Sequence, residues 1–325
     1  DGAFTILGGT FTNGNLTHNV AGDWNDVNGI YQAGAAGEGT ITLSGAGSNI
    51  NTAASNNFFN LTINSAGAEV AQTALDVDGA FTILGGTFTN GNLTHNVAGD
   101  WNDANGTFTP SDGTIILSGS GTSITTAGLN NFYNLTIESG TKNAGSDLDV
   151  NGQINIAGKL ALGAFNADFA ATQQCNITGE LEFSNSTVVC NGGLNANGGI
   201  IRLTNAGTLK ISGSDNPDLG TLFPSSGTVE YDRAGHQNIF ATSYNNLEFD
   251  GSGEKIGGVG TLDINGNLTI TNGDLTFAAS NTDLDLEGNF VIAAGSFTAG
   301  NSSSHDVNGN FEINGGSAVT SSSTI

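Results

Sequence analysis

The sequence is poor in basic residues, and this shortage excludes two kinds of partner. Its 6 Lys and Arg stand against 30 Asp and Glu, for a formal net charge of −24. Nucleic acids and anionic membrane surfaces are both bound through Lys and Arg, so neither is expected as a partner. Membrane insertion is not expected either, because no segment approaches the roughly 18 consecutive apolar residues of a spanning helix.

The composition also argues against helix, collagen and disorder. Gly accounts for 50 of 325 residues, Pro for 3, and Met is absent. Gly, Asn, Thr and Ser dominate and no apolar stripe of period 3.6 is visible, so helices are not expected. Collagen is excluded because Gly does not recur at every third position. Simple disorder is not expected, because apolar residues make up 37% of the chain and are regularly spaced.

Internal repeats are the strongest signal in what is present. Residues 78–103 repeat residues 1–26 letter for letter, and Gly79-Ala80-Phe81 returns as Gly99-Asp100-Trp101, 20 residues later. Between breaks at Gly or Asn-Gly, apolar residues alternate with polar ones, the pattern of short strands that bury one face and meet at corners. One set of such strands in each period predicts one coil of a β-solenoid.

We therefore predict an all-β fold, a right-handed parallel β-helix with coils of about 20–22 residues. The prediction treats residues 1–325 as one continuous β-solenoid. It contains two large internal repeats, 1–77 and 78–147, each holding three to four coils, followed by degenerate coils over 148–325. The second large repeat has lost three residues relative to the first, at a corner near Gly34, where a solenoid tolerates a change of length.

The slot before each corner identifies inward-facing residues. In a Val-x-Gly sequence the Val points inward, the Gly turns the backbone, and an aromatic residue two positions later re-enters the core. Phe81 and Trp101 should therefore lie in one column along the solenoid axis. The slot contains Val20, Val97, Val150 and Val307, and the aromatic positions are Phe4, Trp24, Phe81, Trp101, Phe290 and Phe311.

Both ends of the predicted solenoid lack a capping element. The chain starts inside a repeat, since Asp1 matches Asp78 but nothing precedes Asp1 to match Leu75-Asp76-Val77. We therefore expect the chain to be a piece of a longer protein. An uncapped parallel edge pairs readily with another chain. The expected partners are neighbouring repeats of the same polypeptide or identical chains stacked head to tail.

These repeat motifs carry a family resemblance. They include Leu-Thr-x-x-Val-Ala-Gly-Asp-Trp-Asn at residues 16–25 and 93–102, Gly-Thr-Phe-Thr-Pro at 106–110, Gly-Thr-Ile-x-Leu-Ser-Gly at 113–119 and Asn-Phe-Tyr-Asn-Leu-Thr-Ile at 131–137. The chain resembles the Gly/Thr/Asn-rich β-strand repeats of large secreted cell-surface proteins of Bacteroidota-type bacteria, which are similar to filamentous adhesins. The resemblance implies an extracellular, cell-surface location and a role in adhesion.

Three of the four histidines share one position, two residues before the inward Val. They are His18, His95 and His305. A metal site would need His side chains on adjacent coils, but His18 and His95 are separated by several coils, at least ~15 Å at the strand spacing. We therefore expect packed histidines and no metal ligands.

The two cysteines, Cys175 and Cys190, both fall in inward-facing positions. An extracellular location permits a disulfide between them, and burial as two small apolar thiols is the alternative. A catalytic thiol is not expected, because the position is buried and no His lies nearby in the sequence.

Asp-rich corners are the only candidates for a cofactor, which would be calcium. The pairs are Asp23 with Asp26, Asp100 with Asp103, and Asp283 with Asp285. Asp is also an ordinary corner residue, and this structural role is the favoured interpretation. No cofactor is therefore assigned.

A structural role is favoured over binding or catalysis. We expect a segment of an extracellular fibre, stalk or adhesin shaft, because near-identical copies lengthen a shaft whereas a catalytic site needs no duplication. The first alternative is a polysaccharide-binding surface of stacked Thr, Asn and aromatic side chains. The second is a carbohydrate-active enzyme, which is not favoured because Arg202 and Arg233 stand alone and no paired acids suggest a cleft. No catalytic residue is assigned.

Overall fold

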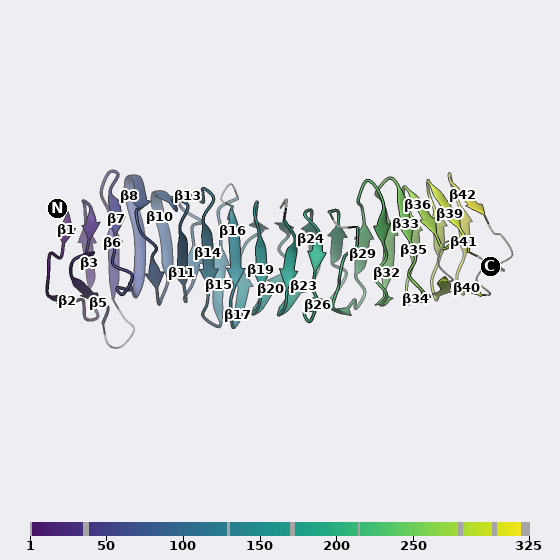
Figure 1. The fold of residues 1–325 in the computed structure, drawn as a ribbon, viewed down its shortest axis with the longest axis horizontal. Helices are drawn as coiled ribbons and strands as arrows, with labels where there is room; N and C mark the ends of the chain where they lie inside the picture. The colour runs from purple at the N-terminus through teal and green to yellow at the C-terminus, as the bar shows by residue number, and fades with distance from the viewer. Residues whose placement is uncertain are drawn as a thin grey trace. The chain divides into compact units, whose positions relative to one another are not determined.

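The fold is built from parallel β-strands. The structure, a computed structural model, describes residues 2–34, 39–128, 131–169, 173–213, 215–278, 282–300 and 304–319. All regular elements in these ranges are strands, and none of the described residues forms a helix able to cross a membrane. The chain divides into two compact units, Asp1–Ala161 and Leu162–Ile325. Each unit is a β-solenoid in which every strand pairs in parallel with strands of the adjacent coils (Figure 1).

The strands of unit 1 are β1 (Phe4–Thr5), β2 (Thr10–Thr12), β3 (Thr17–Val20), β4 (Trp24–Asn25), β5 (Ile30–Gln32), β6 (Thr40–Leu43), β7 (Asn49–Asn51), β8 (Asn60–Ala71), β9 (Asp76–Val77), β10 (Phe81–Thr89), β11 (Thr94–Val97), β12 (Trp101–Asn102), β13 (Thr107–Thr109), β14 (Thr114–Leu117), β15 (Thr122–Thr125), β16 (Asn134–Ile137), β17 (Thr141–Ala144), β18 (Leu148–Asp149) and β19 (Ile154–Ile156). The strand β20 (Lys159–Gly163) lies at the division.

The strands of unit 2 are β21 (Ala167–Phe169), β22 (Cys175–Ile177), β23 (Glu180–Phe183), β24 (Thr187–Cys190), β25 (Leu194–Asn195), β26 (Ile200–Leu203), β27 (Thr208–Ile211), β28 (Thr221–Phe223), β29 (Thr228–Tyr231), β30 (Gln237–Asn238), β31 (Ser243–Tyr244), β32 (Asn246–Phe249), β33 (Glu254–Ile256), β34 (Gly260–Ile264), β35 (Leu268–Ile270), β36 (Asp274–Thr276), β37 (Thr282–Leu286), β38 (Phe290–Ile292), β39 (Ser296–Thr298), β40 (His305–Val307), β41 (Phe311–Ile313) and β42 (Ser317–Val319).

Alternation of apolar and polar residues decides which side chains enter the core. In β6, Ile41 and Leu43 are buried while the two threonines are partly exposed, as a period of two requires. Corners follow where the alternation stops, and Gly91 turns one of them with a φ of 64° that favours glycine. The predicted class, an all-β parallel β-helix, is confirmed.

Aromatic side chains form the predicted column in unit 1. Phe81 of β10 pairs with Trp101 of β12, and their rings stack with centroids 4.8 Å apart and planes inclined by 15°. Phe4 and Trp24 repeat this arrangement in the first copy at 4.4 Å and 18°. Both tryptophans are about 1% exposed. Since a buried aromatic side chain removes roughly 150–250 Å² from water, these columns supply much of the apolar burial of unit 1.

Coil lengths agree with the prediction except where corners lengthen or shorten. Phe81 lies 20 residues before its partner Trp101, but Trp24 lies 26 before its partner Ile50. In the second copy the corresponding pair, Trp101 and Ile124, is 23 apart. The difference between 26 and 23 is the predicted three-residue loss, and it falls within one coil. A spacing of 18 residues separates Lys142 from Leu160 in unit 1 and Tyr231 from Phe249 in unit 2.

The 77-residue repeat does not contain a whole number of coils. In the first copy, Phe4 begins a column that continues through Trp24 and Ile50 to Ala71, three coils later. Phe81 has the same place in the second copy as Phe4 has in the first, yet it does not continue this column. It stacks on Leu61, in the column that starts at His18 on the third strand of the first coil.

From one large repeat to the next, the equivalent residue therefore moves three complete coils along the solenoid axis and two of the three faces around it. The second copy behaves alike, because Ile154, its next equivalent of Phe81, stacks on Leu135 in the column of His95. The three-residue loss does not change this phase. Identical sequence is thus presented on a different face in each copy.

Unit 2 keeps an uninterrupted column despite its degenerate sequence. The inward residues differ in size but occupy the same register position on successive strands of one sheet, from β21 to β41. They are Phe169, Cys190, Ile211, Tyr231, Phe249, Ile270, Ile292 and Ile313. The prediction of one continuous solenoid over residues 1–325 stays a prediction.

Candidate interaction edges and side-chain ladders

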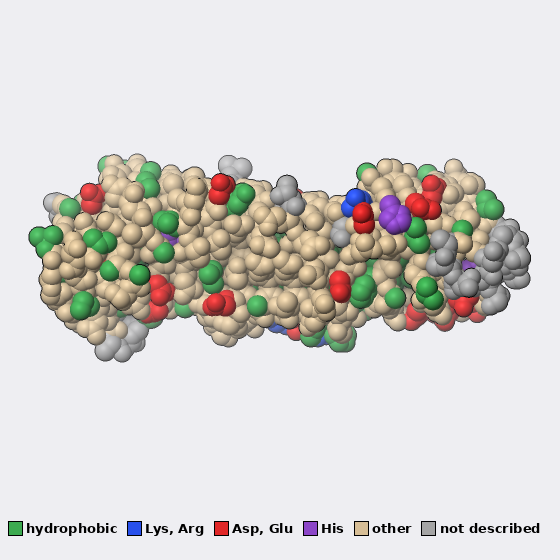
Figure 2. Space-filling model, in the orientation of Figure 1, with side chains coloured by type: hydrophobic (Ala, Val, Ile, Leu, Met, Phe, Trp, Pro, Cys, Tyr) green, Lys and Arg blue, Asp and Glu red, His purple; other side chains and the backbone are tan. Residues whose placement is uncertain are grey.

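The strands β1, β2 and β3 form an exposed edge of unit 1, which we call the N-edge. Leu7 and Leu16 are 80% and 61% exposed there, and Phe4 and Phe11 are only half-buried. Figure 2 shows apolar side chains at the surface of these first coils. The aromatic residue Phe4 is therefore only partly in the core, because no coil covers it on this side among the described residues.

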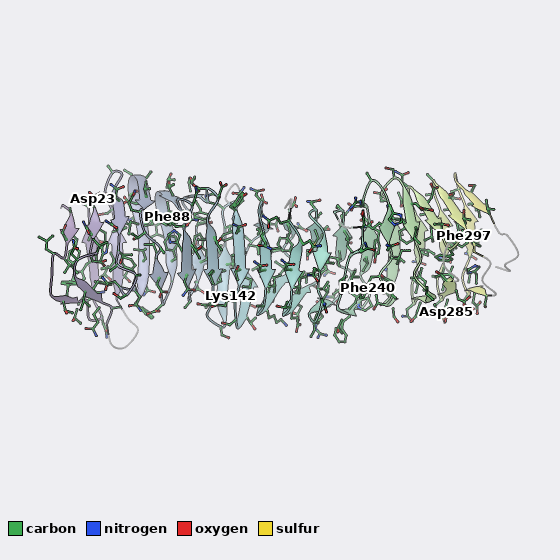
Figure 3. The ribbon with its side chains drawn as sticks, viewed as in Figure 1. Asp23, Phe88, Lys142, Phe240, Asp285 and Phe297 are labelled. Atoms are coloured by element: carbon green, nitrogen blue, oxygen red, sulfur yellow. The ribbon has the colours of Figure 1, made fainter. Side chains whose placement is uncertain are left out.

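The identical residues of the second copy show the same strands when covered. Phe81 and Phe88, the equivalents of Phe4 and Phe11, are 2% and 1% exposed. They are covered by β8, in which Leu61 pairs with Phe81 and Glu69 pairs with Phe88. Figure 3 shows Phe88 within unit 1. The same strand sequence therefore occurs twice in the chain, exposed at the N-edge and covered by β8 in the second copy.

The last coil that the structure describes in unit 2 presents a second exposed edge, which we call the C-edge. It consists of β40, β41 and β42. Phe311, Ile313 and Val319 are 37%, 48% and 55% exposed. Phe311 contacts Phe290 of the preceding coil edge-on at 5.0 Å, so only its other side is open. The prediction that Phe311 and Val307 enter the core holds only in part, because both lie in this last coil.

A ladder of asparagine side chains joins adjacent coils by hydrogen bonds. Each asparagine directly precedes an inward residue of a column, as Asn60 precedes Leu61. The side chain of Asn60 accepts a hydrogen bond of 2.8 Å from the backbone N–H of Ala80, one coil on. Equivalent bonds join Asn134 to Gln153, Asn246 to Asn267, Asn267 to Asn289 and Asn289 to Asn310, all between 2.8 and 3.0 Å. Asn suits this place because its short amide bonds the backbone locally.

Comparison of the chain with protein-family models, with curated proteins and with solved structures gave no match. Its interaction sites are therefore argued from its own geometry.

The aspartates at the corners of the first and second copies act as hydrogen-bond acceptors between coils. Asp26 and Asp103 are fully buried, contrary to an exposed corner, and each accepts the indole N–H of the Trp two residues earlier. Asp23 and Asp100 accept the backbone N–H groups of Asn49 and Ser123, one coil on. Alternation could have revealed the buried pair, because residues i and i+2 share a face.

A row of like charges runs along the outer face of unit 2. Asp263, Asp285 and Asp306 pair in register on β34, β37 and β40. Adjacent carboxylates repel one another, although Ser243 donates a hydrogen bond to Asp263. In the described part of the chain no group of three or more His, Cys, Asp or Glu side chains could hold a metal ion. Asp283 and Asp285 lie within β37, so the prediction that they form a corner is wrong. Calcium binding at any of the three Asp pairs stays a prediction.

Three of the four histidines lie against aromatic side chains, and His95 is packed in the core. His95 is 2% exposed, accepts the backbone N–H of Leu75 at 2.8 Å through Nδ1 and lies 3.1 Å from the carbonyl of Asn90 through Nε2. Burial lowers the pKa of His95 to about 4, so the ring is neutral at neutral pH. His18 and His305 contact Phe11 and Phe277. The expectation of packed histidines is confirmed for His95.

The two cysteines are buried, as predicted, and carry free thiols. Cys175 of β22 and Cys190 of β24 are separated by one strand, and burial together with the neighbouring Cys190 raises the pKa of the Cys175 thiol well above its ordinary value. The structure therefore has the reduced form of the two alternatives, and the Cys175 thiol is not ionised at neutral pH.

The basic residues have separate environments. Arg202 pairs with Glu180 at 3.0 Å and stacks over the ring of Phe223 at 4.2 Å. Arg233 pairs with Asp215 at 2.8 Å. Unlike these two partly exposed arginines, Lys142 of β17 is 0% exposed.

Lys142 lies in the core of unit 1 (Figure 3). Its ammonium donates a hydrogen bond of 2.6 Å to the hydroxyl of Thr122, and burial lowers its pKa to about 8. The alternation within β17 is the sequence signal for this placement. Lys142 and Ala144 are two residues apart in the strand and therefore share the inward face.

Proposed function

We propose that the chain is a structural segment of an extracellular fibre, stalk or adhesin shaft on a bacterial surface, and that it is not an enzyme. The observation that carries the proposal is the advance of each large repeat by three coils and two faces. Duplication on this rule adds coils without interrupting the columns, as Phe81 on Leu61 shows. A repeat that extends the solenoid and preserves its core is what lengthening a shaft requires.

The same advance disfavours one repeated binding face. The outward Thr10 and Thr12 flank Phe11 on the second strand of their coil. Their copies, Thr87 and Thr89, lie on β10 above Ala68 and Val70, on the face that holds Phe4 in the first copy. Selection for a flat ligand platform would keep identical residues on one face, whereas selection for length is indifferent to which face they occupy.

The exposed edges support self-association as the means of assembly. The N-edge and the C-edge both present strand backbone and half-exposed apolar side chains such as Phe4 and Phe311. Parallel edges of this kind pair with further strands unless something covers them. We therefore propose assembly with neighbouring repeats or head to tail with identical chains. The extracellular location rests on the family resemblance.

Electron microscopy of the purified chain tests this proposal. Filaments of constant width that lengthen with protein concentration are the expected result. Discrete, monodisperse particles at all concentrations would overturn assembly by self-association. Immunogold labelling of the source cells supplies the matching localisation test, in which label along surface fibres is expected and label confined to the cytoplasm would contradict the proposal.

A polysaccharide-binding surface is the second candidate, favoured by one observation. Phe223 is 43% exposed, carries Arg202 over its ring, and lies in a shallow hollow with Thr204, Pro224 and Ser225. An exposed ring beside hydroxyls and charged groups suits a sugar, because it offers an apolar face and polar partners together. A glycan array tests it, with binding by the wild type and loss of binding in Phe223→Ala expected. Equal signals from the two would remove this candidate.

A further inference from the structure

We infer that β1 and β2 of the N-edge are covered by β41 and β42 of the C-edge of a second copy of the chain, in a register that places Phe311 on Phe4. This inference rests on the proposed function and specifies the contact that would produce it. Its basis is that the chain contains the same N-edge twice, once exposed at residues 4–20 and once covered at 81–97. The covered copy shows what kind of coil fits.

The segment that covers the second copy has a counterpart in the C-edge. The covering strand begins Asn60-Leu61-Thr62-Ile63-Asn64, and the C-edge contains Asn310-Phe311-Glu312-Ile313-Asn314. In both segments the second and fourth residues are the apolar ones of the column, as Leu61 under Phe81 and Phe311 over Phe290. Phe311 would thus take the place of Leu61 beneath Phe4, and Ile313 that of Ile63 beneath Ile6.

The spacing of the two strands also matches, and better than in the covered copy. Leu61 and Glu69, which pair with Phe81 and Phe88, are eight residues apart, whereas Phe81 and Phe88 are seven apart. The extra residue is accommodated by register shifts between Ile83 and Thr87. In the C-edge, Phe311 and Ala318 are seven residues apart, like Phe4 and Phe11. The intermolecular pairing therefore needs no such shift.

The second contact is more favourable than its internal counterpart. Phe88 is stacked on Glu69, whose burial raises the pKa of its carboxyl. In the C-edge the equivalent residue is Ala318, which continues the column of Phe297. Figure 3 shows Phe297 in the last coils of unit 2. Phe11 would then pack on a methyl group in place of a buried carboxyl group, which removes a desolvation cost.

The backbone polarity is correct for this order of stacking. In the covered copy, the N–H of Leu61 donates to the carbonyl of Ala80 at 3.0 Å, and the N–H of Ala80 donates to the side chain of Asn60. In unit 2, the N–H of Phe290 donates forward to the carbonyl of Asn310 at 2.8 Å. By the same rule, the N–H of Phe311 points to the next coil.

The inferred hydrogen bonds follow directly. Ala3 of one copy is the equivalent of Ala80, so its carbonyl would accept the N–H of Phe311 from the other copy. The N–H of Ala3 would donate to the side-chain oxygen of Asn310, which extends the ladder that already joins Asn267, Asn289 and Asn310. The stack therefore runs from the C-edge of one chain to the N-edge of the next.

Cysteine pairs at outward positions of the two edges test the register. Thr5 and Glu312 are both exposed and would pair as Thr82 and Thr62 do within the chain. Paired Cα atoms of neighbouring strands lie about 4.8 Å apart, within the range that a disulfide spans. The variants are made in a Cys175→Ala, Cys190→Ala background so that no native thiol competes.

On oxidation, the double variant Thr5→Cys, Glu312→Cys should give a ladder of covalent multimers on non-reducing gels. The mismatched pair Thr5→Cys, Ser317→Cys should give none, because Ser317 would lie beside Thr10. The internal pair Thr62→Cys, Thr82→Cys should cross-link within one chain and so controls for fold and oxidation.

The outcomes separate this inference from the proposed function. Filaments in the microscope together with multimers in the mismatched pair, or in neither pair, would overturn the register while leaving the shaft proposal standing. Monodisperse particles with no intermolecular cross-link, but with the internal pair oxidised, would overturn both. Multimers in the matched pair alone support the inference.

Discussion

The indole N–H of Trp101 donates a hydrogen bond of 3.0 Å to the buried carboxylate of Asp103, and Trp24 makes the same bond to Asp26 at 2.9 Å. The second oxygen of Asp103 accepts the backbone N–H of Ala127, one coil on, at 3.0 Å. Each carboxylate therefore links the polar tip of a core aromatic residue to the next coil.

Replacing this carboxylate should destabilise unit 1. In Asp103→Ala two buried donors lose their acceptor, and we expect a loss of about 2–4 kcal/mol in the free energy of unfolding. Asp103→Asn keeps one acceptor oxygen and should lose less. Urea unfolding followed by tryptophan fluorescence measures the difference. Equal midpoints for the wild type and Asp103→Ala would contradict a structural role for the carboxylate.

Acidification should weaken the fold through His95. Its pKa is about 4 in the folded chain and about 6.5 when unfolded, so the unfolded state binds the proton first. Above pH 6.5 His95 is neutral in both states and leaves the free energy of unfolding unchanged. That free energy falls progressively as the pH falls from 6.5 to 4. The full loss is ~3 kcal/mol, at 1.36 kcal/mol for each pKa unit.

The matched variants His95→Gln and His18→Gln isolate this effect from the titration of carboxylates. The residues are identical in local sequence, but only His95 is covered by a further coil. Urea midpoints measured from pH 7.5 to 4.5 should fall less steeply for His95→Gln than for the wild type, while His18→Gln should follow the wild type. Parallel curves for all three proteins would refute the assignment.

Sequence reasoning predicted the coils because their evidence is local. Alternation, Asn-Gly corners and the 20-residue spacing that joins Phe81 to Trp101 are each visible within a few residues. The face on which each copy begins is not local, because it depends on the summed corner lengths of a whole repeat. The placement of Phe81 on Leu61 therefore required the structure.

Residue type is a poor guide to burial where a polar group is buried with a partner. Asp26 does lie at a corner, where Gly29 donates a hydrogen bond to its carbonyl, but its parity with Trp24 places its side chain inside. Lys142 is buried although a charged side chain is rarely found in a core, and the hydroxyl of Thr122 accepts a hydrogen bond from its ammonium group. The partners of Asp26 and Lys142 are Trp24 and Thr122, and residue composition alone does not identify these pairs.

Removing the buried charge of Lys142 should stabilise unit 1. Burial lowers the pKa of Lys142 to about 8, so folding at neutral pH carries the cost of an ammonium in the core. Lys142→Met keeps the length of the side chain without the charge. We expect a higher urea midpoint for Lys142→Met at pH 7 and a difference that shrinks only as the pH rises from 8 past 10.5, above which the lysine is neutral in both states. A lower midpoint at pH 7 would contradict this reasoning.

The same burial governs proteolysis. Lys142 is the first basic residue of the chain, so complete tryptic digestion of unfolded protein should release residues 1–142 intact. Folded protein should not be cut there, because Lys142 lies inside β17 and is 0% exposed. Mass spectrometry of timed digests checks both statements, and early native cleavage after Lys142 would refute the burial.

The thiols should be unreactive in the folded chain. Both Cys175 and Cys190 are 0% exposed, and the raised pKa of Cys175 withholds the reactive thiolate. A chromogenic disulfide reagent should detect no thiol in native protein and two in urea. Detection of none in urea, with recovery of two after reduction, would show that purified protein contains the disulfide alternative.

Truncating the same aromatic residue in the two copies should have unequal effects. Phe81→Ala removes a ring that is 2% exposed and packed between Leu61 and Trp101, so it should cost about 3–5 kcal/mol of folding stability. Phe4→Ala removes the identical ring from a half-buried position and should cost about 1 kcal/mol in the dissociated chain.

The main effect of Phe4→Ala should appear in assembly, since Phe4 is where Phe311 is inferred to stack. Sedimentation at increasing concentration should show weaker association for Phe4→Ala than for Leu84→Ala, an apolar variant at a residue that stays 49% exposed even in the covered copy. If Phe4→Ala and Leu84→Ala associate alike, Phe4 takes no part in the contact, and its half-exposure reflects only its place in the first coil.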